Sequence, residues 1–394
     1  MKEYIVSTQD EYDSIKDEIT ARIIIRNTDG LIEVGGKALI IAAQDSHVKA
    51  KENTIIEAFE NAEVSLYDSA EATIQDTVWL HAFDHSRAYC YGDSEVYAHN
   101  HSLIHAFANT GVQSFDKASI KAHHNSHVTA YGNSCVLASD HAIAVSYEEA
   151  TVRSAGHALV HAFGKSKVDA KGYSQVIARN ESHVHSGDFV RVQSFDSSYV
   201  EAMNDATVFA NDKSHVDARM KVKIIAWDAA TIDAVDNAQI SAVGKTTVEV
   251  FDSVRVEAKG QSMVYAHDET TIIAGDNSSV RAFGHPAVTS GPGVSVARFP
   301  ATRIPLPNEL NTAEHFEKNY IALANTAEFR HNPIHAGRLL IRNAGHGNRE
   351  KILLMLHQKG CHNSREIKDY LMKLFAEHRK PKRETPSNDY SVER

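Results

Sequence analysis

Residues 126–133 read Ser-His-Val-Thr-Ala-Tyr-Gly-Asn, and this pattern of eight residues recurs through most of the 394-residue chain. Counted in eights from residue 46 to residue 285, the register holds for 30 octads without an insertion or deletion. The first position is Ser, Thr or Ala in 26 octads, the third is Val, Ile or Leu in 27, and the fifth is Ala or Ser in 26. A register of this length is typical of a repeat protein.

Within each octad the small or branched residues stand at positions 1, 3 and 5, and mixed polar residues stand between them. This period of two indicates a short strand with one buried face. Position 7 is Asp, Glu, Asn or Gly in 27 octads, which are residues that tolerate the left-handed backbone of a tight corner. Short strands joined by corners in fixed register predict a parallel β-solenoid, in which each coil pairs with the next.

One coil of the solenoid can consist of two octads or of three. Small inward side chains fill only a narrow gap between two sheets, whereas a triangular interior would need larger ones to reach normal packing density. The exceptions at position 1 share one phase of a two-octad period: Val78, Val190, Val222 and Val254. Against this, His81 with His105 and His161 with His185 recur three octads apart. We predict an all-β fold, a parallel β-solenoid with two octads per coil.

The octad Ser-x-Val-x-Ala-x-Gly-x at residues 126–133 resembles the Ser-x-Leu-x-Ala-Gly-x-Gly octad of bacterial ice-nucleation proteins. That resemblance implies a solenoid with two octads per coil, and it covers residues 30–285. The ice-ordering face of that family has Thr at positions 2 and 4 of one octad, and no octad here has that pair. Position 7 also lacks the tyrosine of the family's ladder. The resemblance therefore concerns the fold and does not predict ice nucleation.

The ends of the repeat region predict the domain boundaries. Residues 1–29 form an N-terminal cap with a strand at 4–6 and a short helix that begins at the capping box Thr8-x-x-Glu11. Residues 30–285 form the solenoid, and no proline occurs before Pro286. Proline removes a ladder donor, so we expect the stack to stop there and a proline-rich linker to follow at 286–308.

Beyond the linker the apolar spacing becomes helical and predicts a helical module at 309–378. Phe316 and Tyr320 mark its first helix, Gly360 is a natural helix end, and Asn363 begins the last helix. The polar tail at 379–394 is expected to be disordered. Residues 1–300 have a net charge of −15 and residues 301–394 of +5, which together give the −10 of the chain.

Composition limits where the protein acts. No stretch of 18 apolar residues occurs, so we expect no membrane association, and residues 1–6 lack the pattern of a signal peptide. The three cysteines, Cys90, Cys135 and Cys361, have spacings that form neither a disulfide framework nor a zinc motif. We therefore predict a cytoplasmic protein.

Outward positions supply the candidate binding surface. Aromatic rings at position 6 and histidines at position 4 indicate either docking of a partner or ring stacking along the solenoid. The candidates are Phe59, Tyr67, Phe83, Tyr91, Phe107, Phe115, Tyr131, Tyr147, Phe163, His81, His105, His161 and His185.

We predict no metal site, no cofactor and no catalytic residue. Sixteen of the 17 histidines in the repeats are at outward positions, and the clusters His99/His101/His105 and His123/His124/His127 do not repeat a set of three or four ligands. Solenoid enzymes build clefts from inserted loops, and none is inserted here. The outward carboxylates Asp217, Asp233, Glu249 and Glu257 are read as solvated charges.

These observations predict a non-enzymatic scaffold that presents an acidic, His- and aromatic-rich surface to a macromolecular partner, with protein favoured. The helical module would cap the solenoid or bind a second copy of the chain. Its basic end, Arg379, Lys380, Lys382 and Arg383, could contact nucleic acid, although no recognition helix follows and this use is not favoured. The first alternative is a DNA-mimicking inhibitor of a nucleic-acid enzyme. The second is a carbohydrate-binding or carbohydrate-cleaving β-helix.

Overall fold

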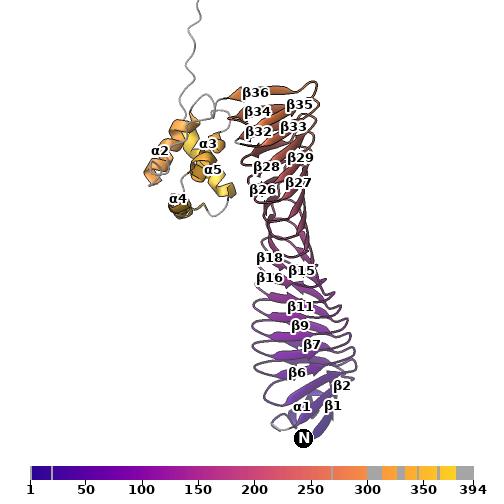
Figure 1. Cartoon of the computed structure of the whole chain (residues 1–394). Helices are drawn as coiled ribbons and strands as arrows, with labels where there is room; N and C mark the ends of the chain where they lie inside the picture. The colour runs from indigo at the N-terminus through magenta and orange to yellow at the C-terminus, as the bar shows by residue number, and fades with distance from the viewer. Residues whose placement is uncertain are drawn as a thin grey trace, which may run out of the picture. The chain divides into compact units, whose positions relative to one another are not determined.

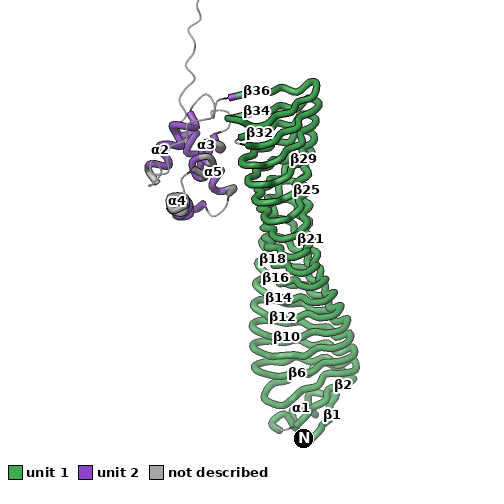
Figure 2. The backbone as a smooth tube through the Cα atoms, in the orientation of Figure 1, with its two compact units in different colours: residues 1–298 green, residues 299–394 purple. Residues whose placement is uncertain are grey.

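The computed structural model of the chain describes residues 2–18, 21–267, 269–299, 313–325, 333–343, 346–361 and 364–378. The chain divides into two compact units, Met1–Arg298 and Phe299–Arg394, shown in different colours in Figure 2. The first unit is built of strands with one short helix near its N-terminal end, and the elements in the described part of the second unit are helices, apart from its first residue, which ends a strand. No helix in the described part of the chain has the length and apolar character needed to cross a membrane.

The first unit is a parallel β-solenoid, as predicted, and its strands form two stacked series (Figure 1). One series, the even sheet, contains β1 (Glu3–Val6), β2 (Arg22–Arg26), β4 (Leu39–Ala43), β6 (Ile55–Ala58), β8 (Glu71–Ile74), β10 (Arg87–Cys90), β12 (Leu103–Ala106), β14 (Ser119–Ala122), β16 (Cys135–Ala138), β18 (Thr151–Ser154), β20 (Lys167–Ala170), β22 (His183–Ser186), β24 (Tyr199–Ala202), β26 (His215–Ala218), β28 (Thr231–Ala234), β30 (Thr247–Val250), β32 (Met263–His267), β34 (Ser279–Phe283) and β36 (Ser295–Phe299). The other, the odd sheet, contains β3 (Leu31–Val34), β5 (His47–Ala50), β7 (Glu63–Leu66), β9 (Trp79–Ala82), β11 (Glu95–Ala98), β13 (Gly111–Ser114), β15 (His127–Ala130), β17 (Ile143–Ser146), β19 (Leu159–Ala162), β21 (Gln175–Ala178), β23 (Arg191–Ser194), β25 (Thr207–Ala210), β27 (Lys223–Ala226), β29 (Gln239–Ala242), β31 (Arg255–Ala258), β33 (Thr271–Ala274) and β35 (Ala287–Ser290).

The pairing register fixes the coil at two octads and excludes three. From β5 to β36 a strand begins at every eighth residue, and neighbours in a sheet are two strands apart in the chain. Val128 of β15, for example, pairs with Val112 on one side and Ala144 on the other, each two octads away in the chain. The predicted two-octad coil is therefore confirmed.

The core lies between the two sheets and is lined by positions 1, 3 and 5, as predicted. Ser126, Val128 and Ala130 of one octad are all fully buried, while His127 between them is exposed. Fully buried Ile and Leu side chains are most frequent near the N-terminal end, where they include Ile23, Ile25, Ile32, Ile40, Ile56, Leu66, Ile74 and Leu80. Beyond β9 the interior is filled mainly by Ser, Ala and Val, which suits a narrow gap between the sheets.

The N-terminal cap contains the predicted capping box. Thr8 precedes the short helix α1 (Gln9–Asp13), its hydroxyl accepts from the Glu11 N–H, and the Glu11 carboxylate accepts from the Thr8 N–H. Tyr12 is buried and its hydroxyl donates to the Gly35 carbonyl at 2.9 Å. The strands β1 and β2 already belong to the even sheet, with β1 paired to β2 and β2 to β4.

Position 7 turns the corner with a left-handed backbone, and its side chain also joins successive coils. Asp196 has φ +57°, and its carboxylate accepts from the backbone N–H of Asn180, one coil earlier, at 2.9 Å. Its own N–H donates to the Asp212 carboxylate at 3.1 Å. The same contact recurs along both corners, for instance from Asp68 to Asp84 and from Asp236 to Asp252. Much of the acidity of the solenoid therefore serves backbone hydrogen bonding.

Substitutions of Asp196 are expected to show whether its hydrogen-bond acceptor or its negative charge stabilises the solenoid. Alanine removes the carboxylate that accepts the Asn180 N–H. It also leaves a residue at positive φ without a polar side chain that could stabilise this backbone conformation. Asp196→Ala should therefore lower the free energy of unfolding by about 1–2 kcal/mol. Asparagine keeps an acceptor, as Asn180 does for the Gly164 N–H, so Asp196→Asn should change it by less than about 0.5 kcal/mol. Urea unfolding followed by circular dichroism measures both. Equal losses in the two variants would show that the charge, and not the acceptor, matters.

The solenoid continues past the boundary that proline predicted. After Pro286, β35 pairs in parallel with β33, and β36 lies next to β34. Position 1 donates its N–H within the corner, as Ser126 does to the His123 carbonyl, so proline at this position costs no ladder bond. The compact unit ends at Arg298, not at residue 285, so residues 286–298 belong to the solenoid and not to a linker.

The second unit contains four helices in its described part, α2 (Ala313–Ala324), α3 (Pro333–Asn343), α4 (His346–Gln358) and α5 (Ser364–His378). Phe316, Tyr320 and Leu371 are buried among them, and the Tyr320 hydroxyl donates to the Leu371 carbonyl at 2.6 Å. Gly360 follows α4 with φ +85°, as its predicted role at the helix end requires. Asn363, residues 300–312 and the tail at 379–394 lie outside the described residues.

Candidate functional site

The structure distributes the candidate binding residues over two corners and two sheets. At the corners that follow odd-numbered strands lie Tyr67, Phe83, Phe115, Tyr131, Tyr147 and Phe163, and at the opposite corners lie Phe59, Tyr91 and Phe107. His81 and His161 lie on the odd sheet, whereas His105 and His185 lie on the even sheet. The pairs that stand three octads apart are therefore on different sheets, and the structure does not bring them together.

Seven of the corner rings form one continuous stack, which we call the long ladder: Tyr67, Phe83, His99, Phe115, Tyr131, Tyr147 and Phe163. Neighbouring ring centroids are 4.8–5.3 Å apart and the rings are nearly parallel. Each such pair contributes about 0.5–1.5 kcal/mol beyond the area it buries. The rings of the long ladder are all partly buried, and burial lowers the pKa of the His99 imidazole. Ring stacking, one of the two interpretations of the sequence, is thus present.

A second row of rings was missed by the sequence analysis, and we call it the outer ladder: His141, His157, Tyr173 and Phe189. These residues occupy position 8 in successive coils, with centroids 5.3–5.5 Å apart. Unlike the long ladder it is exposed, with Tyr173 at 57% and Phe189 at 53% of full exposure. The signal was an aromatic residue at position 8 of every second octad, a spacing that the predicted two-octad coil places in one row.

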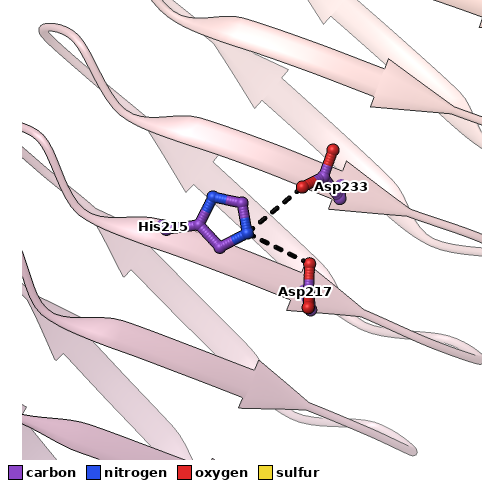
Figure 3. Close-up of side chains that lie close together, drawn as sticks. All are labelled: His215, Asp217 and Asp233. Atoms are coloured by element: carbon purple, nitrogen blue, oxygen red, sulfur yellow. Dashed lines mark hydrogen bonds and ion pairs between the residues drawn. The ribbon is translucent and has the colours of Figure 1, made fainter. Parts of the chain in front are cut away.

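On the even sheet, three side chains converge over two strands (Figure 3). His215 and Asp217 stand at positions 2 and 4 of β26, and Asp233 stands at position 4 of β28, directly beside Asp217. Nε2 of His215 lies 3.2 Å from Oδ1 of Asp217 and 3.2 Å from Oδ2 of Asp233. The three side chains are only 13–16% exposed. We call this group the His–Asp cluster.

Neighbouring residues of β22 and β24 extend the cluster. The Tyr199 hydroxyl donates to Oδ2 of Asp217, and the Tyr199 ring stacks on the His215 ring at 5.2 Å. Glu201 lies 3.6 Å from Nε2 of His183 and 3.5 Å from Nδ1 of His185. Hydrogen bonding to His183 lowers the pKa of the Glu201 carboxyl, against the effect of its burial.

The protonation of His215 follows from its two carboxylate partners. Burial alone would lower the pKa of its imidazole, but hydrogen bonds and electrostatic attraction to Asp217 and Asp233 outweigh burial and raise the pKa to about 9. Without a bound metal, His215 is therefore a cation at neutral pH that bridges two anions. Its hydrogen bonds with them are charge-assisted.

The histidine clusters considered from the sequence do not form ligand sets among the described residues. His99 is part of the long ladder, and His101 stacks on His85 at 5.4 Å. His123 contacts the Ser139 hydroxyl at 2.8 Å, and His124 occupies a corner with φ +55°.

The interpretation of the four outward carboxylates as solvated charges is wrong for three of them. The side chains of Asp217 and Asp233 are 13% exposed and Glu249 is 4% exposed, whereas the Glu257 side chain is 51% exposed. Asp217, Asp233 and Glu249 form one column on the even sheet, whereas Glu257 lies on the odd sheet. The signal for the cluster was His-x-Asp at positions 2 and 4, followed by Asp at position 4 two octads later. The candidate nucleic-acid contacts Arg379, Lys380, Lys382 and Arg383 lie outside the described residues.

The fold and these sites define the chain as a parallel β-solenoid with stacked aromatic corners. No family model matches the chain, and neither the curated proteins nor the solved structures include a significant match to it. The resemblance to ice-nucleation octads therefore stays a prediction.

Proposed function

We propose that the protein is a non-enzymatic, rigid scaffold whose solenoid surface binds a partner protein. The observation that carries this proposal is the outer ladder, in which Tyr173 and Phe189 are more than half exposed. Exposed aromatic side chains are enriched at protein interfaces, where they contribute much of the binding energy.

The setting of the outer ladder favours docking. Around Tyr173 and Phe189 the chain has small residues at the corners, with Gly172 before Tyr173 and Gly187 two residues before Phe189. Each ring packs against the adjacent ring or rings of the outer ladder, and its backbone belongs to a coil that is hydrogen-bonded to the neighbouring coils. Because these rings are already ordered, binding costs little conformational entropy.

The orientation of the rings argues for a protein and against a carbohydrate. The planes of neighbouring rings in the outer ladder differ by 9–13°, so their faces cover one another and their edges face outward. A sugar stacks on the face of a ring, whereas a protein side chain also packs against its edge. The DNA-mimic alternative depends on exposed carboxylates. At many corners one carboxylate oxygen accepts a backbone hydrogen bond, which accounts for these acidic residues without a DNA-binding partner.

Uniform corners support a non-enzymatic role. Strands begin at every eighth residue from β5 to β36, so the connections between them are short and alike. Active-site clefts of repeat enzymes are usually built from longer loops on such a scaffold.

The helical unit is proposed to bind a second copy of the chain. Leu353 and Leu354 of α4 and Met372 of α5 are exposed apolar residues. Leu353 and Leu354 are neighbours in the chain, and exposed apolar side chains that lie close together are typical of association surfaces. Cytoplasmic location is part of the same proposal, because Cys90, Cys135 and Cys361 are all free thiols.

Capture by the immobilised full-length chain tests the proposal. In a lysate of the encoding organism, treated with nuclease, the chain should retain a partner protein that mass spectrometry identifies. With that partner purified, Tyr173→Ser/Phe189→Ser should weaken binding at least about tenfold, the effect expected for two interface anchors. Light scattering on the same preparation should give a mass above the 43.4 kDa of one chain.

The matched control removes two apolar side chains of equal exposure elsewhere. Ile55 and Trp79 are 56% and 55% exposed, so Ile55→Ser/Trp79→Ser should leave the affinity unchanged. Equal affinity of the Tyr173/Phe189 variant and the parent chain would contradict the proposal. Retention of a nucleic-acid enzyme that is lost when corner aspartates become asparagine would support the DNA-mimic alternative instead.

A further inference from the structure

The His–Asp cluster combines one imidazole nitrogen and two carboxylates in a small, partly buried space. One ligand atom from each of His215, Asp217 and Asp233 lies within 4.8 Å of the other two. We propose that these three residues bind a divalent transition-metal cation, with Zn²⁺ as the probe. The cation would be held by Nε2 of His215 and by one carboxylate oxygen of each aspartate.

The distances fit the edges of a coordination shell. Zinc bonds to His nitrogen and carboxylate oxygen are about 2.0–2.2 Å long, so adjacent ligand atoms around one ion are about 3.0–3.5 Å apart. Nε2 of His215 is 3.2 Å from an oxygen of each aspartate, which is the length of two such edges. Only small side-chain rotations would be needed to place an ion among the three atoms.

The charges also favour a cation here. Asp217 and Asp233 are register partners on neighbouring strands, and Glu201 and Glu249 continue the column on either side. Like charges directly opposite each other destabilise a sheet. Partial burial reduces screening by water, so a divalent ion between the carboxylates would be attracted more strongly than at an exposed site.

The surrounding residues resemble the outer support of a metal site. The Tyr199 hydroxyl binds the Asp217 oxygen that does not face His215, and its ring packs on the imidazole. Such contacts orient ligands, and their loss typically weakens metal binding about 10–100-fold. The mixture of imidazole and carboxylate favours Zn²⁺ or Mn²⁺ over Ca²⁺, which prefers oxygen ligands alone.

Without metal, the imidazolium of His215 can neutralise part of the negative charge of Asp217 and Asp233. The experiment therefore distinguishes bound Zn²⁺ from an ion pair among these three side chains. Zn²⁺ is titrated into the metal-free full-length chain by calorimetry, and bound metal per chain is counted by equilibrium dialysis. The parent chain should bind one Zn²⁺ more than Asp217→Asn/Asp233→Asn does. Tyr199→Phe should retain this ion with an affinity at least about tenfold lower.

The control variant is Glu257→Gln, which removes a carboxylate at position 4 of the odd sheet and should bind as the parent does. Circular dichroism shows whether each variant is folded. If the double variant is not, His215→Gln supplies the same comparison. The proposal would be overturned if Asp217→Asn/Asp233→Asn or His215→Gln, when folded, bound as many Zn²⁺ ions as the parent chain. Absence of saturable binding in the parent would do the same.

Discussion

Val152→Asp is expected to destabilise the solenoid by more than about 4 kcal/mol, because it places an unpaired carboxylate between the two sheets. Val152 is at position 3 of β18 and is fully buried. Its neighbours in the sheet, Val136 and Val168, are also buried valines at position 3. The position-3 column is apolar on both sides of β18, so it offers no cation to pair with the new carboxylate.

The next residue on the strand provides the control for this prediction. Arg153 points to the other face and is exposed, so Arg153→Asp should change the free energy of unfolding by less than about 1 kcal/mol. Thermal unfolding followed by far-UV circular dichroism compares both variants with the parent. Similar losses from the two substitutions would mean that the alternation of inward and outward faces is wrong at β18.

The loss of stability caused by Val152→Asp should be largest in the substituted coil and in the coils next to it. In a solenoid each coil contacts only its neighbours, so stability is close to a sum of coil terms and nearest-neighbour terms. Hydrogen exchange should therefore accelerate most in β16, β18 and β20, and least in strands near the N-terminal cap. A uniform acceleration throughout the solenoid would indicate that its coils unfold as one cooperative unit.

The second large effect is a dependence of stability on pH that comes from His215. Its pKa is raised to about 9 in the folded chain from 6.5 in the unfolded one, so the folded state binds the proton more tightly. The stabilisation is fully present below pH 6.5 and is lost as the pH rises through about 9. A shift of this size corresponds to a loss on the order of 3 kcal/mol across that window.

The groups that face His215 set this window and define the controls. Asp217 and Asp233 contact its Nε2, and Tyr199 stacks on its ring. Urea unfolding in EDTA at pH 6 and pH 9.5 should show the loss in the parent chain. His215→Gln should remove most of the difference between the two pH values. A His215→Gln variant with the same pH dependence as the parent would contradict the assignment.

Much of the fold could be predicted because each octad repeats the same local instructions. Ser126, Val128 and Ala130 alternate with polar residues, and Gly132 turns the corner, so strand, face and turn follow from one octad. Pro286 shows the limit of this reasoning. Proline was expected to end the stack, but at position 1 it replaces only a corner donor, and that follows from the hydrogen-bond pattern of a complete coil.

The sites were harder to predict because they depend on residues that stand two octads apart in the chain. Phe83, His99 and Phe115 alternate phenylalanine with histidine. The candidates at position 6 were phenylalanine and tyrosine only, so the long ladder was not identified as one stack although the predicted coil places these residues side by side. The outer ladder and the His–Asp cluster have the same cause. Histidines spaced by three octads suggested a neighbourhood that the two-sheet coil does not create.

The sequence alone determined the strand period, the inward and outward faces and the turn residues, because these depend on the order of residues within one octad. The sequence also predicted two octads per coil. The tertiary structure excluded the three-octad alternative and decided where the stack ends and which outward side chains meet. Lateral pairing between coils brings His215 and Asp217 next to Asp233 and stacks Tyr173 on Phe189. Such contacts are set by the number of octads per coil, a property of packing between the sheets that no single octad contains.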